Sequence, residues 1–330
     1  MKTINKNILY ILLTCLFISC SKDDKGSRIV TSQPTSNIFL ADPTIFKDNG
    51  TYYLYGTSQG SLTNKGNGFL VYSSTDLQKW QGPIGNIEGF ALKDTDAFGN
   101  TGFWAPQIFK YSNMFYMAYT ANEKIAIASS NNPLGPFINS GSPISEASQI
   151  DPFVFTDEDG KSYLYHVRLA NGNRIFVAEM NDNFQTIKEE TLTEIITATE
   201  PWENTENASW PVAEGPTVLK LDGTYYLFYS TNDFRNPDYA VGYASATNPM
   251  GPWTKSANNP IIHGSMINEN GAGHGDVFHN EQGNMEYVLH THFSASVVHP
   301  RKSGVIQLQK NGDDISSLPE TFEFLKQTVN

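Results

Sequence analysis

The sequence predicts an all-β fold, a five-bladed β-propeller, and three observations support this prediction. One phrase, made of an apolar strand, a turn signal and a second apolar strand, occurs five times along the chain. Turn signals such as Asp-Gly supply the positive φ that a tight hairpin needs. A further apolar alternation follows each hairpin, and no segment after the N-terminal apolar run has convincing helical periodicity. Units of three or four strands that recur in this way are typical of a propeller.

The five predicted hairpins follow one another along the chain. They are ADPTIFKDNGTYYLYGTS from Ala41, APQIFKYSNMFYMAYT from Ala105, DPFVFTDEDGKSYLYH from Asp151, GPTVLKLDGTYYLFYS from Gly215 and HGDVFHNEQGNMEYVLH from His274. The outer strands expected after them are GFLVYSS, KIAIASS, RIFVAEM, YAVGYASA and SGVIQLQ. A β-sandwich is the competing fold, but its strands alternate without one phrase that returns five times.

Two kinds of segment connect the predicted hairpins. NPLGPF and NPMGPW combine turn residues with an aromatic residue, which predicts a turn followed by an anchor between adjacent sheets. Residues 186–210, between the third and fourth units, are longer than a blade requires and contain Trp202 and Trp210. This region either overhangs a site or forms only a longer edge strand and loop.

The first residues have the layout of an export signal. Lys2 and Lys6 precede an apolar run from Ile8 to Ile18, which is shorter than the about 20 residues that span a bilayer. The following LFISCSKDDKG resembles the lipobox of bacterial lipoproteins. The resemblance implies a signal peptide over residues 1–19, lipidation of Cys20 and anchoring in a membrane, expected to be the outer membrane, on its periplasmic or surface side. Ordinary signal cleavage beside an incidental cysteine is the alternative.

Composition and charge bound the rest of the chain. Residues 20–37 are polar and predict a lipidated cysteine followed by a flexible tether, so a single propeller domain is expected over residues 38–330. Both cysteines lie within or at the end of the apolar run, so no disulfide can stabilise this domain. The 34 Asp and Glu exceed the 22 Lys and Arg, which disfavours nucleic acid as a partner and fits a neutral ligand such as a sugar. The sequence leaves the oligomeric state open.

Acidic residues occupy matched positions in the repeat. Aligning the five inner strands places Asp42, Ala105, Asp151, Gly215 and His274 at equivalent positions. The fourth unit also has Glu214, one residue before its matched position. Because the innermost strand of every blade starts beside the axis, these positions are expected to form a ring. Clustered carboxylates repel one another, so a fold that gathers them is expected to use them.

Two uses of such a cluster remain open at this point. Carboxylate oxygens can hold a divalent cation, or two carboxylates can act as acid and base on a glycoside. The asymmetry of the ring favours the second use. A carboxylate in a poorly solvated position beside another negative charge has a raised pKa and stays protonated, while a second one stays ionised and accepts a proton.

The ordered motifs ADPTIF, FWAPQI, IDPFVF, AEGPTVLK and GHGDVF resemble those of glycoside hydrolase family 43, the five-bladed propeller enzymes that act on arabinose- and xylose-containing polysaccharides. The resemblance extends from about Phe39 to at least Leu308. It implies that Asp42 is the general base, that Glu214 is the general acid, and that Asp151 adjusts the pKa of the acid and orients it. Family members invert anomeric configuration, which requires about 6.5–9.5 Å between base and acid so that water fits.

Other residues are candidates for binding the substrate. The resemblance suggests that Trp104 in FWAP lines the sugar pocket, with a core position between blades as the alternative. Phe153 in the third unit is a further candidate. Arg301 in HPRKSGVIQL is expected to contact sugar hydroxyls or Glu214, unless it lies on the surface.

A metal at the axis is a separate hypothesis. In many relatives a histidine like His274 in GHG lies near a central cation, usually calcium, often through water. Calcium prefers oxygen ligands, so one histidine is an unusual basis for such a site, and the chemistry itself requires no cofactor. His290 and His292 lie nearby in the sequence, and Gln107 stands where many relatives carry an acidic residue.

Three other functions fit the sequence less well. A non-catalytic surface glycan-binding lipoprotein would not need all three carboxylates. A retaining, fructan-cleaving propeller enzyme would have an Asn-Asp-Pro-Asn stretch before the first blade, which is absent. A nucleotide-binding protein would be expected to have a Gly-rich phosphate loop between a strand and a helix, and the sequence contains no such loop. The resemblance implies an inverting glycosidase, which we expect to be an exo-acting α-L-arabinofuranosidase or β-xylosidase, with endo-arabinanase and galactan-directed activities as alternatives within the family.

Overall fold

The computed structural model describes residues 34–58 and 67–329. The expected signal peptide, Cys20 and most of the expected tether lie outside these residues. Within the described part of the chain, no helix is long and apolar enough to cross a membrane.

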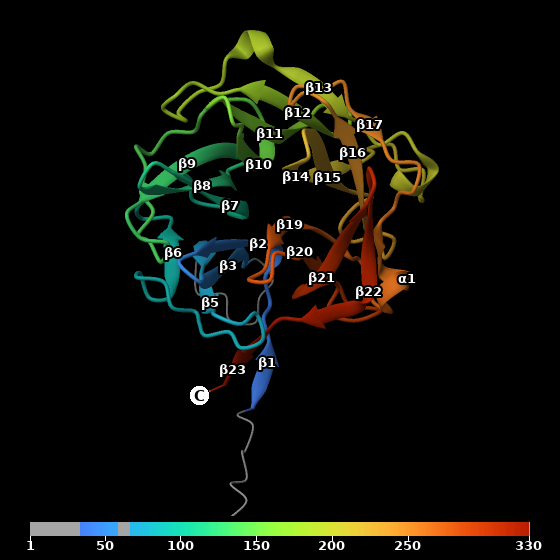
Figure 1. Cartoon of the computed structure of the whole chain (residues 1–330). Coiled ribbons are helices and arrows are strands. Elements are labelled where there is room, and N and C mark those ends of the chain that lie inside the picture. Colours follow the sequence, from blue (N-terminus) through green and yellow to red (C-terminus); the bar gives the residue numbers. More distant parts are fainter. Residues whose placement is uncertain (1–33, 59–66, 330) are drawn as a thin grey trace, which may run out of the picture. The chain divides into compact units, whose positions relative to one another are not determined.

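Five antiparallel sheets surround a central axis and form the five blades of a propeller, which confirms the predicted fold (Figure 1). In each blade the first strand is innermost, and most later strands follow it outward in chain order. Blade one contains β2 (Ala41–Asp48), β3 (Thr51–Thr57) and β5 (Tyr72–Ser74), and blade two contains β7 (Trp104–Tyr111), β8 (Met114–Ala121) and β9 (Lys124–Ser130). Blade three contains β10 (Gln149–Thr156), β11 (Ser162–Leu169), β12 (Asn173–Glu179) and β13 (Thr193–Ile196). Blade four contains β14 (Ala213–Leu221), β15 (Thr224–Thr231), β16 (Ala240–Ala246), β17 (Thr254–Lys255) and β18 (Ile262–His263), and blade five contains β19 (Gly273–His279), β20 (Met285–Thr291), β21 (Lys302–Asn311) and β22 (Asp314–Phe324).

The remaining elements join or extend the blades. Strand β1 (Thr35–Asn37) pairs with β23 (Lys326–Thr328), so pairing reaches into the segment that the sequence assigned to the tether. Strand β4 (Gly68–Leu70) pairs with β6 (Phe90–Lys93), and α1 spans Gly264–Ile267. The long region after blade three forms η1 (Glu189–Thr191), the edge strand β13, η2 (Pro201–Glu203) and a loop. This region therefore supplies both an edge strand and a loop.

The hydrophobic core is divided among the five interfaces between neighbouring blades. Five clusters of buried apolar side chains are present, and each combines residues of two adjacent sheets. Tyr55 and Met117 illustrate the contact between blades one and two, and Leu54 and Val288 illustrate the contact between blades one and five. Phe137, from the NPLGPF turn, is fully buried in the first of these clusters, as the anchor prediction expected. Apolar burial thus stabilises the packing of blades around the axis and leaves the axis itself to polar groups.

The matched positions of the repeat share one unusual backbone conformation. Their φ angles are 47° at Asp42, 45° at Ala105, 54° at Asp151, 59° at Gly215 and 40° at His274. At each of these positions the register between the first two strands shifts, which marks a β-bulge. A left-handed backbone turns each residue out of the strand pattern. The bulges therefore direct these side chains together at the end of the axis.

A closed ring of hydrogen bonds links these bulges around the axis. Each matched residue uses its backbone N–H to contact a side chain of the preceding blade. The donors and acceptors are Asp42 N and His290 Nδ1 (3.1 Å), Ala105 N and Thr57 Oγ1 (2.9 Å), Asp151 N and Thr120 Oγ1 (3.0 Å), Gly215 N and Asp151 Oδ2 (3.2 Å), and His274 N and Ser230 Oγ (2.8 Å). The first blade bonds to the fifth, so the ring closes and holds the strained bulges in place.

Candidate active site

A pocket of about 480 Å³ lies where the inner strands begin. Asp42, Asp151 and Glu214 all line it, although they are separated by up to 172 positions in the sequence. The side chains around them include Trp104, Asn173, Trp210, Asp233, Phe234, Arg235, His274, His299 and Arg301. The structure thus brings together the three carboxylates that the repeat register predicted.

Asp42 is a buried carboxylate held in its ionised form. Arg301 Nη1 donates to its Oδ1 at 3.0 Å, and Thr57 Oγ1 donates to its Oδ2 at 2.6 Å. Burial alone would raise the pKa of Asp42, but the charge of Arg301 and the hydrogen bond from Thr57 hold it well below its usual range. An ionised carboxylate beside a pocket can accept a proton, so the environment of Asp42 suits a general base.

Glu214 has the opposite environment. Its carboxylate accepts hydrogen bonds from Tyr239 Oη at 2.8 Å and from Asn173 Nδ2 at 2.9 Å. Burial raises the pKa of Glu214 to about 7, although these two hydrogen bonds act in the opposite direction. A carboxyl group that keeps its proton near neutral pH can donate it, so Glu214 suits a general acid.

Asp151 lies next to both groups. Burial, together with repulsion from Glu214 and Asp42, raises the pKa of Asp151 well above its usual value. The N–H of Gly215, which follows Glu214 directly, donates to Asp151 Oδ2 at 3.2 Å. Two buried carboxyl groups that repel each other lose their protons in separate steps, so the pair Asp151 and Glu214 retains one proton over a range of pH.

Aromatic rings connect the base to the acid. The ring of His290 lies against Asp42, with Nδ1 3.4 Å from Oδ1. Tyr239, which bonds Glu214, stacks on His290 with 5.6 Å between ring centroids and 15° between planes. The stacked rings of His290 and Tyr239 therefore connect Asp42 to Glu214.

The position of Glu214, one residue before its matched position, has a steric cause. The matched residue Gly215 has φ +59°, and a Cβ there would lie 2.8 Å from Cδ2 of His274. Any side chain at the matched position of blade four would collide with the histidine ring. The blade consequently provides its carboxylate from the preceding residue, whose longer side chain reaches the same pocket.

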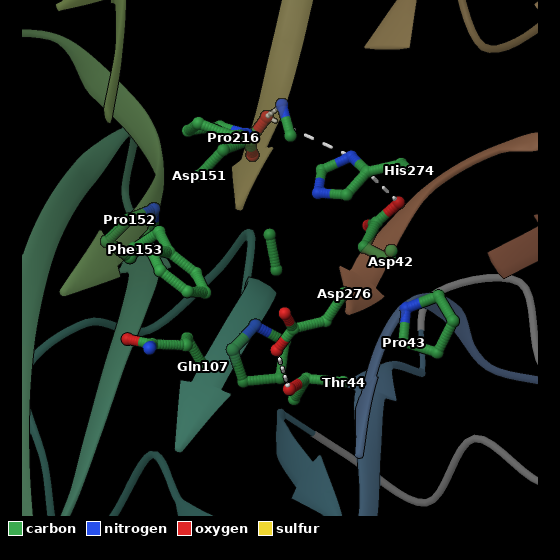
Figure 2. A pocket seen from close by; sticks show the side chains of 14 residues that line it. Asp42, Pro43, Thr44, Gln107, Asp151, Pro152, Phe153, Pro216, His274 and Asp276 are labelled. Atoms are coloured by element: carbon green, nitrogen blue, oxygen red, sulfur yellow. Dashed lines mark hydrogen bonds and ion pairs between the residues drawn. The ribbon is translucent and has the colours of Figure 1, made fainter. Parts of the chain in front are cut away.

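His274 lies between two of the carboxylates. Its Nδ1 is 3.5 Å from Asp42 Oδ1 and 3.9 Å from Asp151 Oδ2. Dashed lines in Figure 2 mark both pairs. Burial lowers the pKa of His274, which favours the neutral ring. Among residues 34–58 and 67–329, no three His, Cys, Asp or Glu side chains converge closely enough to hold a metal ion. The reaction proposed for the three carboxylates requires no metal.

Comparisons with known proteins identify the family of the chain. A model of the glycosyl hydrolases of family 43 matches residues 31–310. The chain belongs to glycosyl hydrolase family 43. Among solved structures it is similar to an endo-1,4-β-xylanase from Bacteroides thetaiotaomicron, with 39% identity, a TM-score of 0.83, and coverage of 90% of this chain and 99% of that chain. A thermostable family-43 glycoside hydrolase is 34% identical, with a TM-score of 0.77 over 86% of this chain and 93% of its own. The xylosidase/arabinosidase 43A of Humicola insolens is 27% identical over 66% of this chain and 79% of its own.

The structure distinguishes the other predicted site residues of this family 43 glycosidase. Trp104 lines the pocket, where its indole packs over Gly102. Arg301 also lines the pocket. Its partner is Asp42, whereas the sequence predicted a contact with sugar hydroxyls or with Glu214. Phe153 lies deeper, in a narrow axial cavity of about 20 Å³, and is not among the residues that line the large pocket.

The narrow axial cavity is formed by a second set of matched residues, two positions after the first. Four of these, Thr44, Gln107, Phe153 and Asp276, line the cavity, and the fifth, Thr217, contacts Asp276. Thr44 Oγ1 donates to Asp276 Oδ2 at 2.7 Å, and Thr217 Oγ1 donates to Asp276 Oδ1 at 2.5 Å. Figure 2 marks the bond from Thr44 with a dashed line. Gln107 exchanges two hydrogen bonds with the backbone of Val154, at 3.0 and 2.9 Å. An ionised carboxylate at position 107 could not donate to the Val154 carbonyl, so the glutamine joins blades two and three.

Several residues of the site were missed by reasoning from the sequence. Asn173 and Tyr239 bond the acid, and Thr57 bonds the base. Thr57 is the last residue of the second strand of its blade, and Thr120 and Ser230 are each the last residue but one of theirs, so hydroxyl residues near the end of this strand were a signal in the repeat. Asn173 and Tyr239 begin or precede third strands, where the five units share no common residue type.

Proposed function

We propose that this glycosidase removes terminal arabinofuranosyl or xylosyl residues from plant oligosaccharides or polysaccharides, with inversion at the anomeric carbon. One observation carries the proposal: two carboxylates of opposite electrostatic character line one pocket and are bridged by the stacked rings of His290 and Tyr239. The names of the relatives, an endo-1,4-β-xylanase and a xylosidase/arabinosidase, support pentose-containing substrates.

The proposed reaction is a single displacement by water. Asp42 takes a proton from the water as its oxygen bonds to the anomeric carbon. Glu214 gives its proton to the glycosidic oxygen as the bond from that oxygen to the anomeric carbon breaks. Asp151 favours the protonated form of Glu214 until the proton is transferred, because two adjacent negative charges are costly in a buried site. Afterwards the proton on Asp42 and the charge on Glu214 exchange with solvent, and the site is restored.

The exo-acting assignment is tested with a panel of substrates. Aryl α-L-arabinofuranoside, β-D-xyloside and β-D-galactoside are compared with linear arabinan, arabinoxylan and xylan. Release of single pentose units from chain ends or branches is expected. Release of mixed oligosaccharides from linear arabinan would instead identify an endo-arabinanase, and binding without any hydrolysis would identify a glycan-binding protein.

The mechanism is tested by the stereochemistry of the first product and by two variants. NMR spectra recorded during turnover should show the inverted anomer first, followed by mutarotation, whereas initial retention would refute the proposed single displacement. Asp42→Asn and Glu214→Gln should each reduce kcat by at least about 10³-fold while circular dichroism stays unchanged. Near-normal rates in either purified variant would remove that residue from the mechanism.

We also propose that the protein is a lipoprotein anchored through Cys20 to the outer membrane. The motif LFISCSKDDKG supports this proposal. Mass spectrometry of the protein isolated from its native membrane should identify a lipidated Cys20 as the N-terminus, and Cys20→Ser should move the protein to the soluble fraction. A soluble wild-type protein that retains an unmodified cysteine would overturn the proposal.

A further inference from the structure

The loop before blade four is a firmly anchored arch, defined here as residues 199–212. Glu203, which is fully buried, accepts hydrogen bonds from Lys255 Nζ at 2.6 Å and from Tyr229 Oη at 2.7 Å. It also accepts from the backbone N–H groups of Thr199 and Glu200, at 2.6 and 2.8 Å. A buried carboxylate with four donors is costly to disrupt. The start of the arch is therefore fixed to blade four.

The end of the arch is fixed to the catalytic acid. Asn173 N donates to Pro211 O at 2.9 Å. Trp210 Nε1 donates to Asn173 Oδ1 at 2.9 Å, and the amide nitrogen of the same asparagine donates to Glu214 Oε2 at 2.9 Å. The bond from Trp210 thus orients the amide so that its nitrogen faces the acid. The indole ring is held beside the acid, yet the residue is 48% exposed.

A second cleft, of about 630 Å³, lies along the arch and adjoins the catalytic pocket. The two cavities share Trp210, Val212, Asp233 and Arg235. The remaining lining of the second cleft is mostly amide and small side chains, including Asn204, Ala208, Ser209 and Asn236. Asp233 and Arg235 form an ion pair with each other, with Nε 2.7 Å from Oδ1, so their charges offset one another. An exposed aromatic ring beside amide groups is suited to a neutral, hydroxyl-rich ligand.

The position of the acid decides which part of a substrate this cleft would receive. Glu214 must face the glycosidic oxygen, and the leaving sugar lies beyond that oxygen. The cleft begins at Trp210, on the side of the acid, whereas the base Asp42 contacts Arg301 and His290. We infer that the cleft along the arch is a binding site for the leaving-group side of the substrate, a chain of neutral sugars of which one packs on Trp210.

This inference rests on the proposed function and adds to it a preference for oligosaccharides over substrates with small leaving groups. The test compares a 4-nitrophenyl glycoside, which has no leaving sugar, with linear oligosaccharides of two to five units of the sugar that the wild type cleaves. Ala208→Trp places a large ring in the cleft from an exposed residue of the arch. Ser140→Trp, at an exposed residue outside both cavities, is the matched control.

The expected result is a change in preference between the two kinds of substrate. Wild-type kcat/KM should rise with chain length, and Ala208→Trp should lower kcat/KM for the longer oligosaccharides at least about tenfold relative to the 4-nitrophenyl glycoside. Trp210→Ala should remove the same advantage. Trp210→Phe keeps an aromatic ring but loses the N–H bonded to Asn173. This variant should keep part of the preference for longer oligosaccharides, but its kcat should be lower for both kinds of substrate, because Asn173 contacts the acid. An unchanged ratio in Ala208→Trp and Trp210→Ala would overturn the inference.

Failure of the proposed function would look different. If the wild type hydrolyses none of these compounds, the catalytic proposal fails, and the cleft is then tested by calorimetric titration with arabino- and xylo-oligosaccharides. Binding that weakens at least about tenfold in Ala208→Trp but not in Ser140→Trp would retain the site. Absence of binding, or equal binding to all three proteins, would exclude it.

Discussion

Replacing Glu214 by glutamine should stabilise the folded protein in a manner that depends on pH. Burial raises the pKa of this group from an ordinary value of 4.5 to about 7. Between these two values the folded state holds a proton that the unfolded state has released, so the free energy of unfolding decreases as pH increases. At about 1.36 kcal/mol per pH unit, the resulting loss of stability is about 0.8 kcal/mol at pH 5 and about 3.3 kcal/mol at pH 8. Glutamine is neutral at both pH values and avoids this loss.

Urea unfolding at pH 5 and pH 8 measures the effect. The stability of Glu214→Gln relative to wild type should increase by about 2.5 kcal/mol between the two pH values. Asp151 should contribute in the same direction, because its ionisation becomes easier when the neighbouring charge is removed. Glu206→Gln, at an exposed glutamate of the arch, is the matched control. An equal difference at both pH values would show that Glu214 ionises as readily in the folded state as in the unfolded state, and the argument for its role as acid would fail.

Three further predictions follow from the same site. Replacing Arg301 by methionine removes the positive charge beside Asp42, so its pKa rises and the acidic limb of the kcat/KM profile should move to higher pH; an unmoved limb would contradict the ion pair. Asp151→Asn removes repulsion and should lower the pKa of Glu214, which moves the alkaline limb to lower pH, so an unchanged alkaline limb would count against its modulating role. Ala105→Gly relieves a φ of 45°, which costs alanine about 1–2 kcal/mol, whereas glycine loses about 0.5–1 kcal/mol more in backbone entropy, so urea unfolding should show a net gain of about 0.5–1 kcal/mol. A loss of stability would mean that the strain at Ala105 is smaller than this entropic cost.

The fold and the three carboxylates could be predicted because both depend on the repeat. Hairpin signals recur in every unit, and a residue at a matched position must lie near the axis if the units are blades. The register of the repeat therefore predicts that Asp42 and Asp151 lie close together, and both line the pocket. The offset of Glu214 could be noticed but not explained, because its cause is the collision of a Cβ at Gly215 with His274 of the next blade.

The remainder of the site could not be predicted because it belongs to single blades. Asn173 and Tyr239 are polar residues at the edge of third strands, where similar residues are commonly exposed. Packing of blade three against blade four brings Asn173 to the acid, whereas Tyr239 reaches the acid from the segment before the third strand of the acid's own blade. The arch has no counterpart in the other units. The repeat register therefore could not predict that Trp210 of the arch contacts the acid through Asn173.

Ala105 shows which features of the site belong to the fold and which belong to catalysis. It has the same left-handed backbone and the same bulge as Asp42 and Asp151, but its methyl side chain has no acid, base or hydrogen-bonding function. The strained conformation is therefore a general property of the propeller bulges, since it also occurs where no chemistry requires it. Catalysis depends instead on which side chain occupies each bulge and on its partners, such as the Arg301 charge beside Asp42. Five equivalent positions can in this way carry a base, a modulator, a histidine, a glycine and an inert alanine without any change in the backbone that supports them.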